Sequence, residues 1–350
     1  MKLRHSHCRA VWTLSLLILG VCLLASAHDR SGNDCQPQFG PWTAPVNLGP
    51  PVNTVFTEVD PFISKDGRSL YFSCPDCPGG FGGYDLWVSR RASVNDPWGP
   101  PENLGPSVNT ASNETNPALS NDEHKLYFTS NRPGGLGATD LYVSRRHNRR
   151  DDFGWQLPEN LGAGINSAFN DRMATYFEDD ETGDITLYFS SDRPGGPGSD
   201  DIYSSTLQTD ETFGPAALVV ELSSPASDKV PSIRRRDGLE IFLSSNREGS
   251  VLTPGGKPSP DLWVSTRPST ADPWSEPVNL GTVVNSPFDD ARTSLSSDGT
   301  ILYFASAQRA GNVSTLFDIW MTTRERLDGE DCGHDHRGDH QGCHSRHGRD

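Results

Sequence analysis

Short apolar segments alternate with polar, Gly-rich and Pro-rich stretches along most of the chain. One segment, an apolar residue followed by aromatic or aliphatic residues, recurs five times: at 70–72, 126–128, 187–189, 241–243 and 302–304. Short apolar runs bounded by turn residues are typical of β-strands. The pattern therefore predicts an all-β protein built from many short strands.

Two further phrases recur in fixed order around these segments. An Asp-aliphatic-aromatic phrase stands at 85–87, 140–142, 201–203, 261–263 and 318–320. A phrase that carries a Trp and ends in Asn-Leu-Gly stands at 41–49, 97–105, 155–162 and 273–281, with Phe213 in place of the Trp in one further copy. Each copy predicts four short strands, and four-stranded units at a period of about 57 residues are typical of propeller blades.

The ends of the chain predict how the ring closes. The first Trp phrase, at 41–49, precedes any first strand of a blade, and the last copy stops after its third strand, near Thr323. The 41–49 phrase can therefore supply the outer strand of the last blade, which removes a free sheet edge. We expect a five-bladed β-propeller over 41–327, with tight hairpins at Asp66-Gly67, Asp237-Gly238 and Asp298-Gly299.

The repeat Ser-x-Asp-Gly, Leu-Tyr-Phe, Arg-x-Gly-Gly, Asp-Leu-Tyr resembles the TolB-type, WD-repeat-like propeller repeat of exported bacterial proteins. The resemblance covers nearly all of 41–327. It implies the fold and no single activity, because such propellers serve as docking platforms, envelope components and parts of enzymes. Blade one departs from the pattern at 74–80, where a Cys-Pro-Asp-Cys loop replaces Arg-Pro-Gly-Gly, and blade four lacks the Asn-Leu-Gly phrase.

The N-terminus has the pattern of a signal peptide. A basic head precedes an apolar run at 11–24 and an Ala-Ser-Ala sequence at 25–27. This predicts cleavage after Ala27, with 1–27 as the signal, 28–40 as a linker and a secreted or periplasmic mature chain. The alternatives are a membrane anchor, for which the run is short, and a lipoprotein signal at Cys22, which the bulky Val21 disfavours. No later segment is expected to span a membrane.

Charge and cysteine content narrow the partners. The chain carries 30 Lys+Arg against 46 Asp+Glu, a formal charge of −16, which argues against binding nucleic acid through bulk charge. Cys74 and Cys77 are expected in a loop disulfide, or one of them pairs with Cys35, because a lone Cys-x-x-Cys lacks the second ligand pair of a zinc site.

The segment 328–350 is expected to be a disordered tail rich in His and Cys. Histidines at this density are typical of divalent-metal binding. The candidate metal ligands on this tail are His334, His336, His340 and His344. No other cofactor is expected.

An acidic residue opens the first strand of every blade. These residues are Glu58, Glu114, Asp171, Asp228 and Asp290. The loop between the second and third strands carries an arginine in four blades: Arg132, Arg193, Arg247 and Arg309. Because both sets fall on the face of the loops around the channel, the simplest interpretation is that they pair and brace the loops.

Positions where the blades differ are better candidates for ligand binding. One side of the channel mouth offers Glu58 and Asp60, and the other offers Arg172, Lys229 and Arg292, with Asp289 adding an acid. A mouth of mixed charge suits a sugar, a peptide or an acidic ligand. The expected ligand-binding set is Arg172, Asp228, Lys229, Asp290 and Arg292.

Two functions from different classes follow. The first is a non-catalytic platform that binds a protein or glycan on the loop-rich face. The alternative is a glycoside hydrolase, since five-bladed propellers also form a class of these enzymes and the reaction needs two carboxyl groups. The catalytic candidates under that alternative are Glu58, Asp60, Glu114 and Asp171. The basic run 234–236 is interpreted as a solvated charge run on the opposite face.

Overall fold

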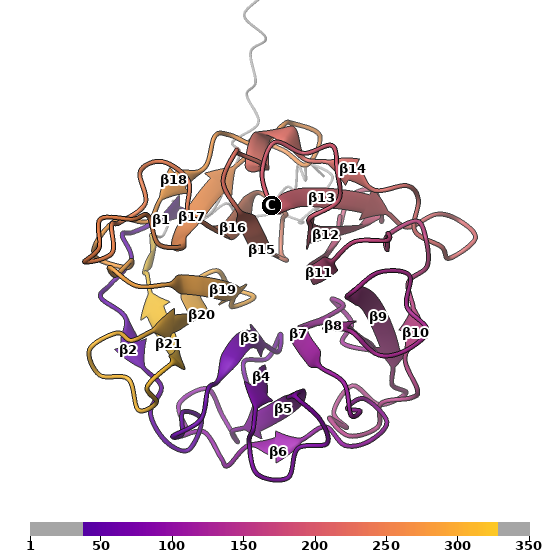
Figure 1. Cartoon of the computed structure of the whole chain (residues 1–350), viewed down its shortest axis with the longest axis horizontal. Coiled ribbons are helices and arrows are strands. Elements are labelled where there is room, and N and C mark those ends of the chain that lie inside the picture. Colours follow the sequence, from indigo (N-terminus) through magenta and orange to yellow (C-terminus); the bar gives the residue numbers. More distant parts are fainter. Residues whose placement is uncertain (1–37, 328–350) are drawn as a thin grey trace, which may run out of the picture. The chain divides into compact units, whose positions relative to one another are not determined.

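Residues 38–327 form a five-bladed β-propeller, and these are the residues that the computed structural model describes. Five antiparallel sheets of four strands each stand around a common centre (Figure 1). The predicted fold is therefore confirmed. Among the described residues, no helix is both long and apolar enough to cross a membrane.

In blades one to four the strands run from the channel outward in chain order. Blade one contains β3 (Val59–Ile63), β4 (Ser69–Pro75), β5 (Tyr84–Arg90) and β6 (Glu102–Asn103). Blade two contains β7 (Glu114–Leu119), β8 (Lys125–Ser130), β9 (Asp140–Arg145) and β10 (Glu159–Asn160). Blade three contains β11 (Asp171–Glu178), β12 (Ile185–Ser191), β13 (Asp201–Thr206) and β14 (Ala217–Leu218), followed by the 3₁₀ turn η1 (Val220–Leu222). Blade four contains β15 (Asp228–Ile233), β16 (Glu240–Ser245), β17 (Asp261–Thr266) and β18 (Val278–Asn279).

Blade five is closed by the N-terminal part of the propeller. It contains β19 (Asp290–Leu295), β20 (Ile301–Ala307), β21 (Phe317–Thr323) and, on the outside, β2 (Val46–Asn47). The register joins Val46 to Met321 and Asn47 to Trp320, as the position of the first Trp phrase predicts. This pairing joins the two ends of the ring without leaving a free edge on the last blade.

A second pairing of the two ends lies beyond the expected closure. Strand β1 (Gln38–Phe39) pairs with β22 (Arg326–Leu327). The linker expected over 28–40 therefore does not hold for residues 38–39, because their backbone groups hydrogen-bond to the chain that leaves blade five. The predicted signal peptide, the rest of the linker and the His-rich tail lie outside the described residues.

The repeated Trp phrase is a packing device between the third and fourth strands. An arginine that follows the third strand lies over each Trp ring, at 4.2 Å for Arg91 over Trp98 and 4.3 Å for Arg146 over Trp155. Trp155 is 3% exposed. A guanidinium over an indole face gains cation–π attraction while it covers apolar surface. The Trp residues therefore stabilise the outer part of the four blades that carry one.

The repeated Asn residues hold the loop after each fourth strand. In blade one, Asn109 accepts a hydrogen bond from the amide of Leu86 and donates to its carbonyl, both at 2.9 Å. Asn109 also donates to Asn103 of the Asn-Leu-Gly phrase. The blade without this pair is blade three and not blade four as expected, because the Phe213 copy supplies β14. There Ser223 accepts from the amide of Ile202 instead, at 3.1 Å.

Candidate functional site

The five acidic residues that open the first strands, here called the acidic ring, are buried and hold the neighbouring loops in place. They are Glu58, Glu114, Asp171, Asp228 and Asp290. All five carboxylates are 0% exposed. Four of them form ion pairs with the predicted arginines: Glu114 with Arg132 at 3.1 Å, Asp171 with Arg193, Asp228 with Arg247 at 2.5 Å, and Asp290 with Arg309 at 2.9 Å. The predicted pairing is therefore confirmed in four blades.

Blade three shows what each brace joins. Asp171 accepts hydrogen bonds from the amide and hydroxyl of Ser167 in the preceding loop, at 2.6 and 2.7 Å, and from Ser191 at the end of β12. Arg193 also donates to the carbonyl of Ile165. One carboxylate thus ties together the inner strand, the second strand and both adjoining loops. A carboxylate held in this way has no lone pair directed at a ligand.

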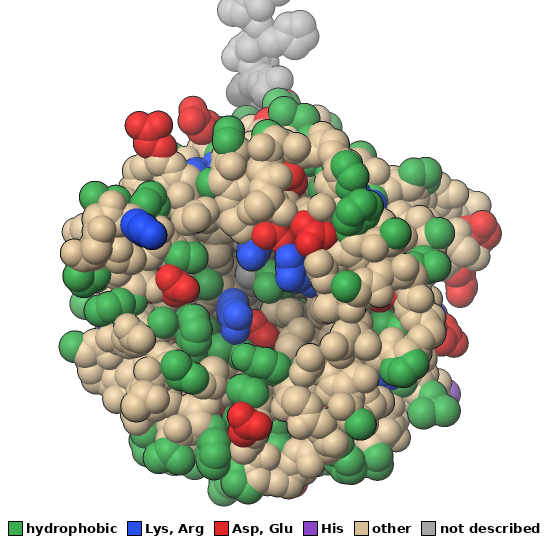
Figure 2. Space-filling model, viewed as in Figure 1, with side chains coloured by type: hydrophobic (Ala, Val, Ile, Leu, Met, Phe, Trp, Pro, Cys, Tyr) green, Lys and Arg blue, Asp and Glu red, His purple; other side chains and the backbone are tan. Residues whose placement is uncertain are grey.

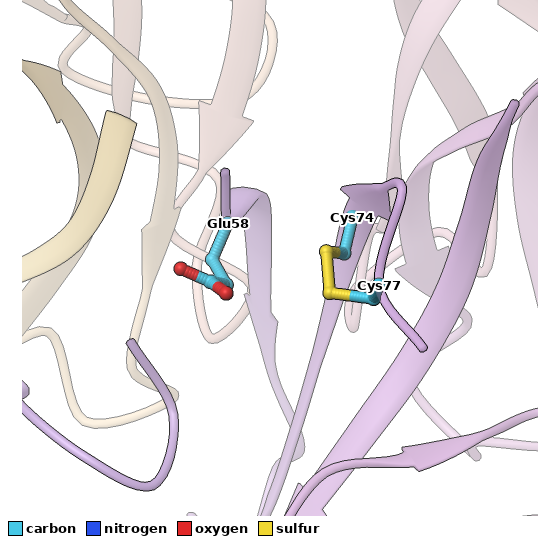
Figure 3. A group of neighbouring side chains, drawn as sticks. All are labelled: Glu58, Cys74 and Cys77. Atoms are coloured by element: carbon cyan, nitrogen blue, oxygen red, sulfur yellow. A yellow bond between two sulfur atoms is a disulfide. The ribbon is translucent and has the colours of Figure 1, made fainter. Parts of the chain in front are cut away.

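Blade one replaces the arginine with a disulfide. Cys74 and Cys77 are bonded to each other, which decides between the two predicted pairings (Figure 3). Glu58 lies beside them and accepts only from Thr54, from its amide at 3.1 Å and its hydroxyl at 2.5 Å. Burial raises the pKa of Glu58, and the nearby charge of Asp318 acts in the same direction.

This group is the one cluster of metal-ligand type among residues 38–327. One ligand atom from each of Glu58, Cys74 and Cys77 lies within 4.8 Å of the others. A structural zinc site uses thiolates and four ligands. The disulfide engages both sulfurs, so the group in this state does not match that donor set. The predicted metal ligands His334, His336, His340 and His344 lie outside the described residues.

The innermost strand of every blade carries a bulge, and the bulged residues Asp60, Asn116 and Arg292 line the channel. The register shifts within β3, β7, β11, β15 and β19. The bulged residue has a positive φ at Asp60, Asn116, Met173 and Arg292, between 54° and 64°. Non-glycine residues rarely adopt this conformation, and such bulges re-aim side chains near functional sites.

Blade five lacks the hydroxyl group that accepts a hydrogen bond from a bulge amide in other blades. The bulge amide of Asn116 donates to the hydroxyl of Ser73 at 3.2 Å, and that of Arg292 donates to Ser244 at 3.2 Å, so each bulge is held by the second strand of the preceding blade. The corresponding residue of blade five is Ala305, which has no hydroxyl to offer Asp60. Asp60 is therefore the bulged residue whose setting is unlike the others.

Charged side chains meet at the centre of the ring. Figure 2 shows Lys and Arg side chains next to Asp and Glu side chains in the hollow there. Arg172 pairs with Asp200, and Lys229 pairs with the same carboxylate at 3.0 Å. Across the channel, Arg292 lies 3.4 Å from Asp60. The structure thus brings Asp60, Arg172, Lys229 and Arg292 to the channel. In contrast, Glu114, Asp171, Asp228 and Asp290 lie buried in ion pairs with arginines, and Glu58 lies buried beside the disulfide.

Two carboxyl groups of this mouth differ in their electrostatic setting. Burial acts to raise the pKa of Asp200, but the charges of Arg172 and Lys229 outweigh it and lower the pKa. Burial raises the pKa of the half-buried Asp289, and the negative charge of Asp290 raises it further. The positive charge of Arg292 lowers this pKa in part. The pKa of Asp289 is therefore raised and that of Asp200 lowered, and the charge of Arg292 acts on Asp289 while its Nε lies 3.4 Å from Asp60 Oδ1.

Asp200 was missed from the sequence although a signal was present. Blade three has Asp200-Asp201 where the other blades have a single Asp at the start of the third strand. The second Asp braces the loop, and the first is free to pair with cations of the channel. A doubled residue in one copy of a repeat marks a broken symmetry, and broken symmetry is where a ligand site is expected.

Several polar atoms of the channel have no partner within the described chain. They are Asp60 Oδ1, Asn116 Nδ2, Arg172 Nε and Thr293 Oγ1, apart from the 3.4 Å ion-pair contact of Asp60. The channel holds a cavity of about 30 Å³ between the five inner strands, lined by Asp60, Asn116 and Thr293 among others. That volume is roughly the share of one water in liquid. The narrow part therefore has room for a water or a single hydroxyl group.

Comparison with known proteins bears on the fold. No protein-family model matches the chain, and no curated protein matches it. Three solved structures are similar over most of their length. The α-L-arabinofuranosidase of Lactobacillus brevis has a TM-score of 0.54 and 16% identity, covering 81% of this chain and 94% of that one. The GH62 α-L-arabinofuranosidase catalytic domain of Coprinopsis cinerea has a TM-score of 0.54 and 16% identity, and the match covers 83% of this chain and 98% of that one. The arabinanase of Bacillus subtilis has a TM-score of 0.52 and 15% identity, and the match covers 79% of this chain and 96% of that one.

These similarities define the class of fold as the five-bladed propeller found in glycoside hydrolases. At this identity they establish the fold and leave the reaction to other arguments. They nevertheless overturn the order of the two expected functions. The non-catalytic platform was expected first, and the neighbours are enzymes that act on glycans, which favours the alternative. The resemblance to the TolB-type repeat stays a prediction.

Proposed function

We propose that the protein is a glycoside hydrolase that binds a glycan at the channel mouth. The observation that carries the proposal is the ion pair of Asp60 with Arg292 in a channel with unused hydrogen-bond donors and acceptors. A second carboxyl group, Asp289, lies near enough for the charge of Arg292 to lower its pKa in part. The neighbours of the same fold include arabinofuranosidases and an arabinanase.

The two carboxyl groups are suited to different parts of the reaction. Glycosidic cleavage needs one carboxyl that gives a proton to the leaving oxygen and a second that activates water or attacks the sugar. Asp289 is the proposed acid because burial raises its pKa. Asp60 is the proposed second group, because its Oδ1 carries no hydrogen bond from the described chain and its ion pair with Arg292 fixes its position.

The remaining polar groups suit a ligand rich in hydroxyls. Asn116 Nδ2 and Arg172 Nε are unused donors, and Thr293 Oγ1 can both donate and accept. A buried polar atom without a partner costs free energy that a ligand hydroxyl recovers. The ion pairs of Arg172 and Lys229 with Asp200 hold one wall of the mouth in place. Because these cations are already paired, the proposed glycan is neutral. The predicted signal peptide would deliver such an enzyme outside the cytoplasm.

The test is hydrolysis by the full chain. Aryl α-L-arabinofuranosides, aryl β-xylosides and a panel of polysaccharides are incubated with the wild type, Asp289→Asn and Asp60→Asn. Loss of a general acid typically lowers the rate by about 100-fold or more. The matched control is Asp272→Asn, which changes an exposed Asp in a turn where it accepts from Ser269. Turnover that survives Asp289→Asn and Asp60→Asn within about threefold of the control refutes the proposed site.

A further inference from the structure

The far end of the channel contains a second cavity, built by the hairpins that join the first and second strands of the blades. Its volume is about 300 Å³. The residues that matter to the argument are Lys65, Asn121, Arg235, Arg236, Ser297 and Asp298. Together with Asp180 of blade three they come from all five blades, so the cavity lies where these hairpins converge. A volume of this size is at the lower end of the range for small-ligand sites.

Arg235 is a buried cation without a carboxylate partner. Arg235 is 9% exposed, and its Nη2 donates a hydrogen bond to the carbonyl of Ile63 at 2.9 Å. The guanidinium lies 4.9 Å from the ring of Phe62. Its Nη1 has no hydrogen-bond partner, and no carboxylate of residues 38–327 forms an ion pair with it. Burial lowers the pKa of Arg235 to about 10, so the group is still charged at neutral pH.

The neighbouring Arg234 differs from Arg235 in having carboxylate partners. Arg234 pairs with Asp237 at 2.7 Å and with Glu240 at 3.3 Å. Both Arg234 and Arg235 are buried, so interpreting 234–236 as a solvated charge run was wrong for these two residues. An unpaired buried charge is costly, and it persists in a fold when something else compensates it. For Arg234 two carboxylates supply that compensation, whereas Arg235 has only the carbonyl of Ile63, the ring of Phe62 and the more distant charge of Glu123.

The acidic groups near the cavity do not supply that compensation. Asp298 accepts from Ser296 and Thr300 within its own turn, and these bonds lower its pKa against the effect of burial. Glu123 accepts from the amide of Lys65 at 2.5 Å, and its charge acts on Arg235 without forming an ion pair.

Polar groups complete the surroundings of Arg235. The exposed side chains of Lys65 and Arg236 face the cavity, and so does the exposed Asp180. Asn121 is half-buried, and its Oδ1 has no hydrogen-bond partner. The cavity is therefore lined by three cationic side chains and two acidic ones. Of the acids, Asp298 accepts hydrogen bonds within its own turn and Asp180 is exposed to water.

We propose that this cavity binds a small oxyanion, a phosphate or carboxylate group, with the guanidinium of the lining residue Arg235 as the central donor group and Lys65 and Arg236 as flanking charges. A guanidinium presents parallel donors that match both kinds of oxyanion. The site lies on the channel end opposite the proposed glycan site, and its occupancy does not require hydrolysis.

The test is calorimetric titration of the full chain with inorganic phosphate and, separately, with malonate, at constant ionic strength set by sodium chloride. Wild type is expected to give saturable binding of one anion per chain. Loss of a charged hydrogen bond is worth about tenfold in the dissociation constant, so Arg235→Gln is expected to weaken binding by at least that factor. Lys65→Met and Arg236→Gln change exposed residues and are expected to weaken binding by about threefold each.

The matched control is Arg145→Gln, which removes an exposed guanidinium paired with Glu159 at 2.5 Å. It is expected to bind like wild type. Binding of phosphate, of malonate or of both supports the site and identifies the oxyanion. If neither anion gives saturable binding, or if Arg145→Gln weakens binding as much as Arg235→Gln, the proposal is refuted. Should Arg235→Gln fail to fold, the Lys65 and Arg236 variants decide the test.

Discussion

Replacing Asp171 with Asn separates a bracing role for the acidic ring from a catalytic one. Asn keeps the shape of the side chain and removes its charge. The carboxylate is fully buried and accepts from Ser167, Ser191 and Arg193. If the oxygen of the substituted side chain stays with the guanidinium, the new amide group faces the backbone N–H of Ser167, and two donors then oppose each other.

The magnitude follows from these contacts. One buried N–H without an acceptor costs about 1–3 kcal/mol. Breaking a buried ion pair by removing one partner costs about 3–5 kcal/mol, and the value is at the lower end here because the Arg193 side chain is 17% exposed. We therefore expect Asp171→Asn to lower the free energy of unfolding by about 3 kcal/mol, with Asp228→Asn similar because its contacts with Ser224 and Arg247 match those of Asp171 with Ser167 and Arg193.

Glu58→Gln is the internal contrast. Glu58 has no arginine partner, and burial already disfavours its charged form. The expected loss is about 1 kcal/mol or less, since no cation is left unpaired. Urea denaturation of the three variants measures these differences. If Asp171→Asn costs less than about 1 kcal/mol and abolishes glycan hydrolysis, the acidic ring is catalytic and the bracing argument is wrong.

Three further predictions concern stability. Asn53→Ala removes two hydrogen bonds to the backbone of Ile319 and one to the side chain of Asn47. We therefore expect the free energy of unfolding, measured by urea denaturation, to fall by about 3 kcal/mol. A fall of less than about 1 kcal/mol would contradict the closure of the ring by these contacts. Reducing the disulfide of Cys74 frees a four-residue loop and is expected to cost about 2 kcal/mol by the loop-entropy argument; equal stability in oxidised and reduced protein would refute it. Burial raises the pKa of Asp261 from 3.8 to about 6, so the protonated form is favoured in the fold. The free energy of unfolding of the wild type, relative to Asp261→Asn, should fall as pH rises through this interval, and a difference that rises instead contradicts the assignment.

Much of the fold could be predicted because every blade repeats the same local solutions. The aromatic second strand, the Asp of the third strand and the Asn-Leu-Gly phrase each make the same contacts in copy after copy, as Asn109 does with Leu86. A feature that recurs five times is visible in one sequence. The closure by β2 was predictable for the same reason, because one strand was missing at one end and present at the other.

The site was harder to predict because it depends on what is not repeated. The five acids of the acidic ring were candidates because they recur in every blade. In four blades that recurrence reflects a structural role, since each acid pairs with an arginine of its own blade. Asp200 pairs with Arg172 and Lys229 across two blades, a contact that depends on the curvature of the ring. Arg235 was placed in a solvated run because the sequence does not show that its hairpin faces the channel.

The most direct test of the proposed function is the pH dependence of kcat/KM for the aryl glycoside that the wild type hydrolyses fastest. If Asp289 is the proton donor, kcat/KM falls as pH rises past its raised pKa, and Asp289→Asn abolishes that alkaline limb together with most of the rate. Asp171→Asn, measured below its unfolding temperature, should keep the limb. A wild-type profile that Asp289→Asn leaves unchanged, or no turnover of any glycan by the folded wild type, contradicts the claim that this channel mouth cleaves glycosidic bonds.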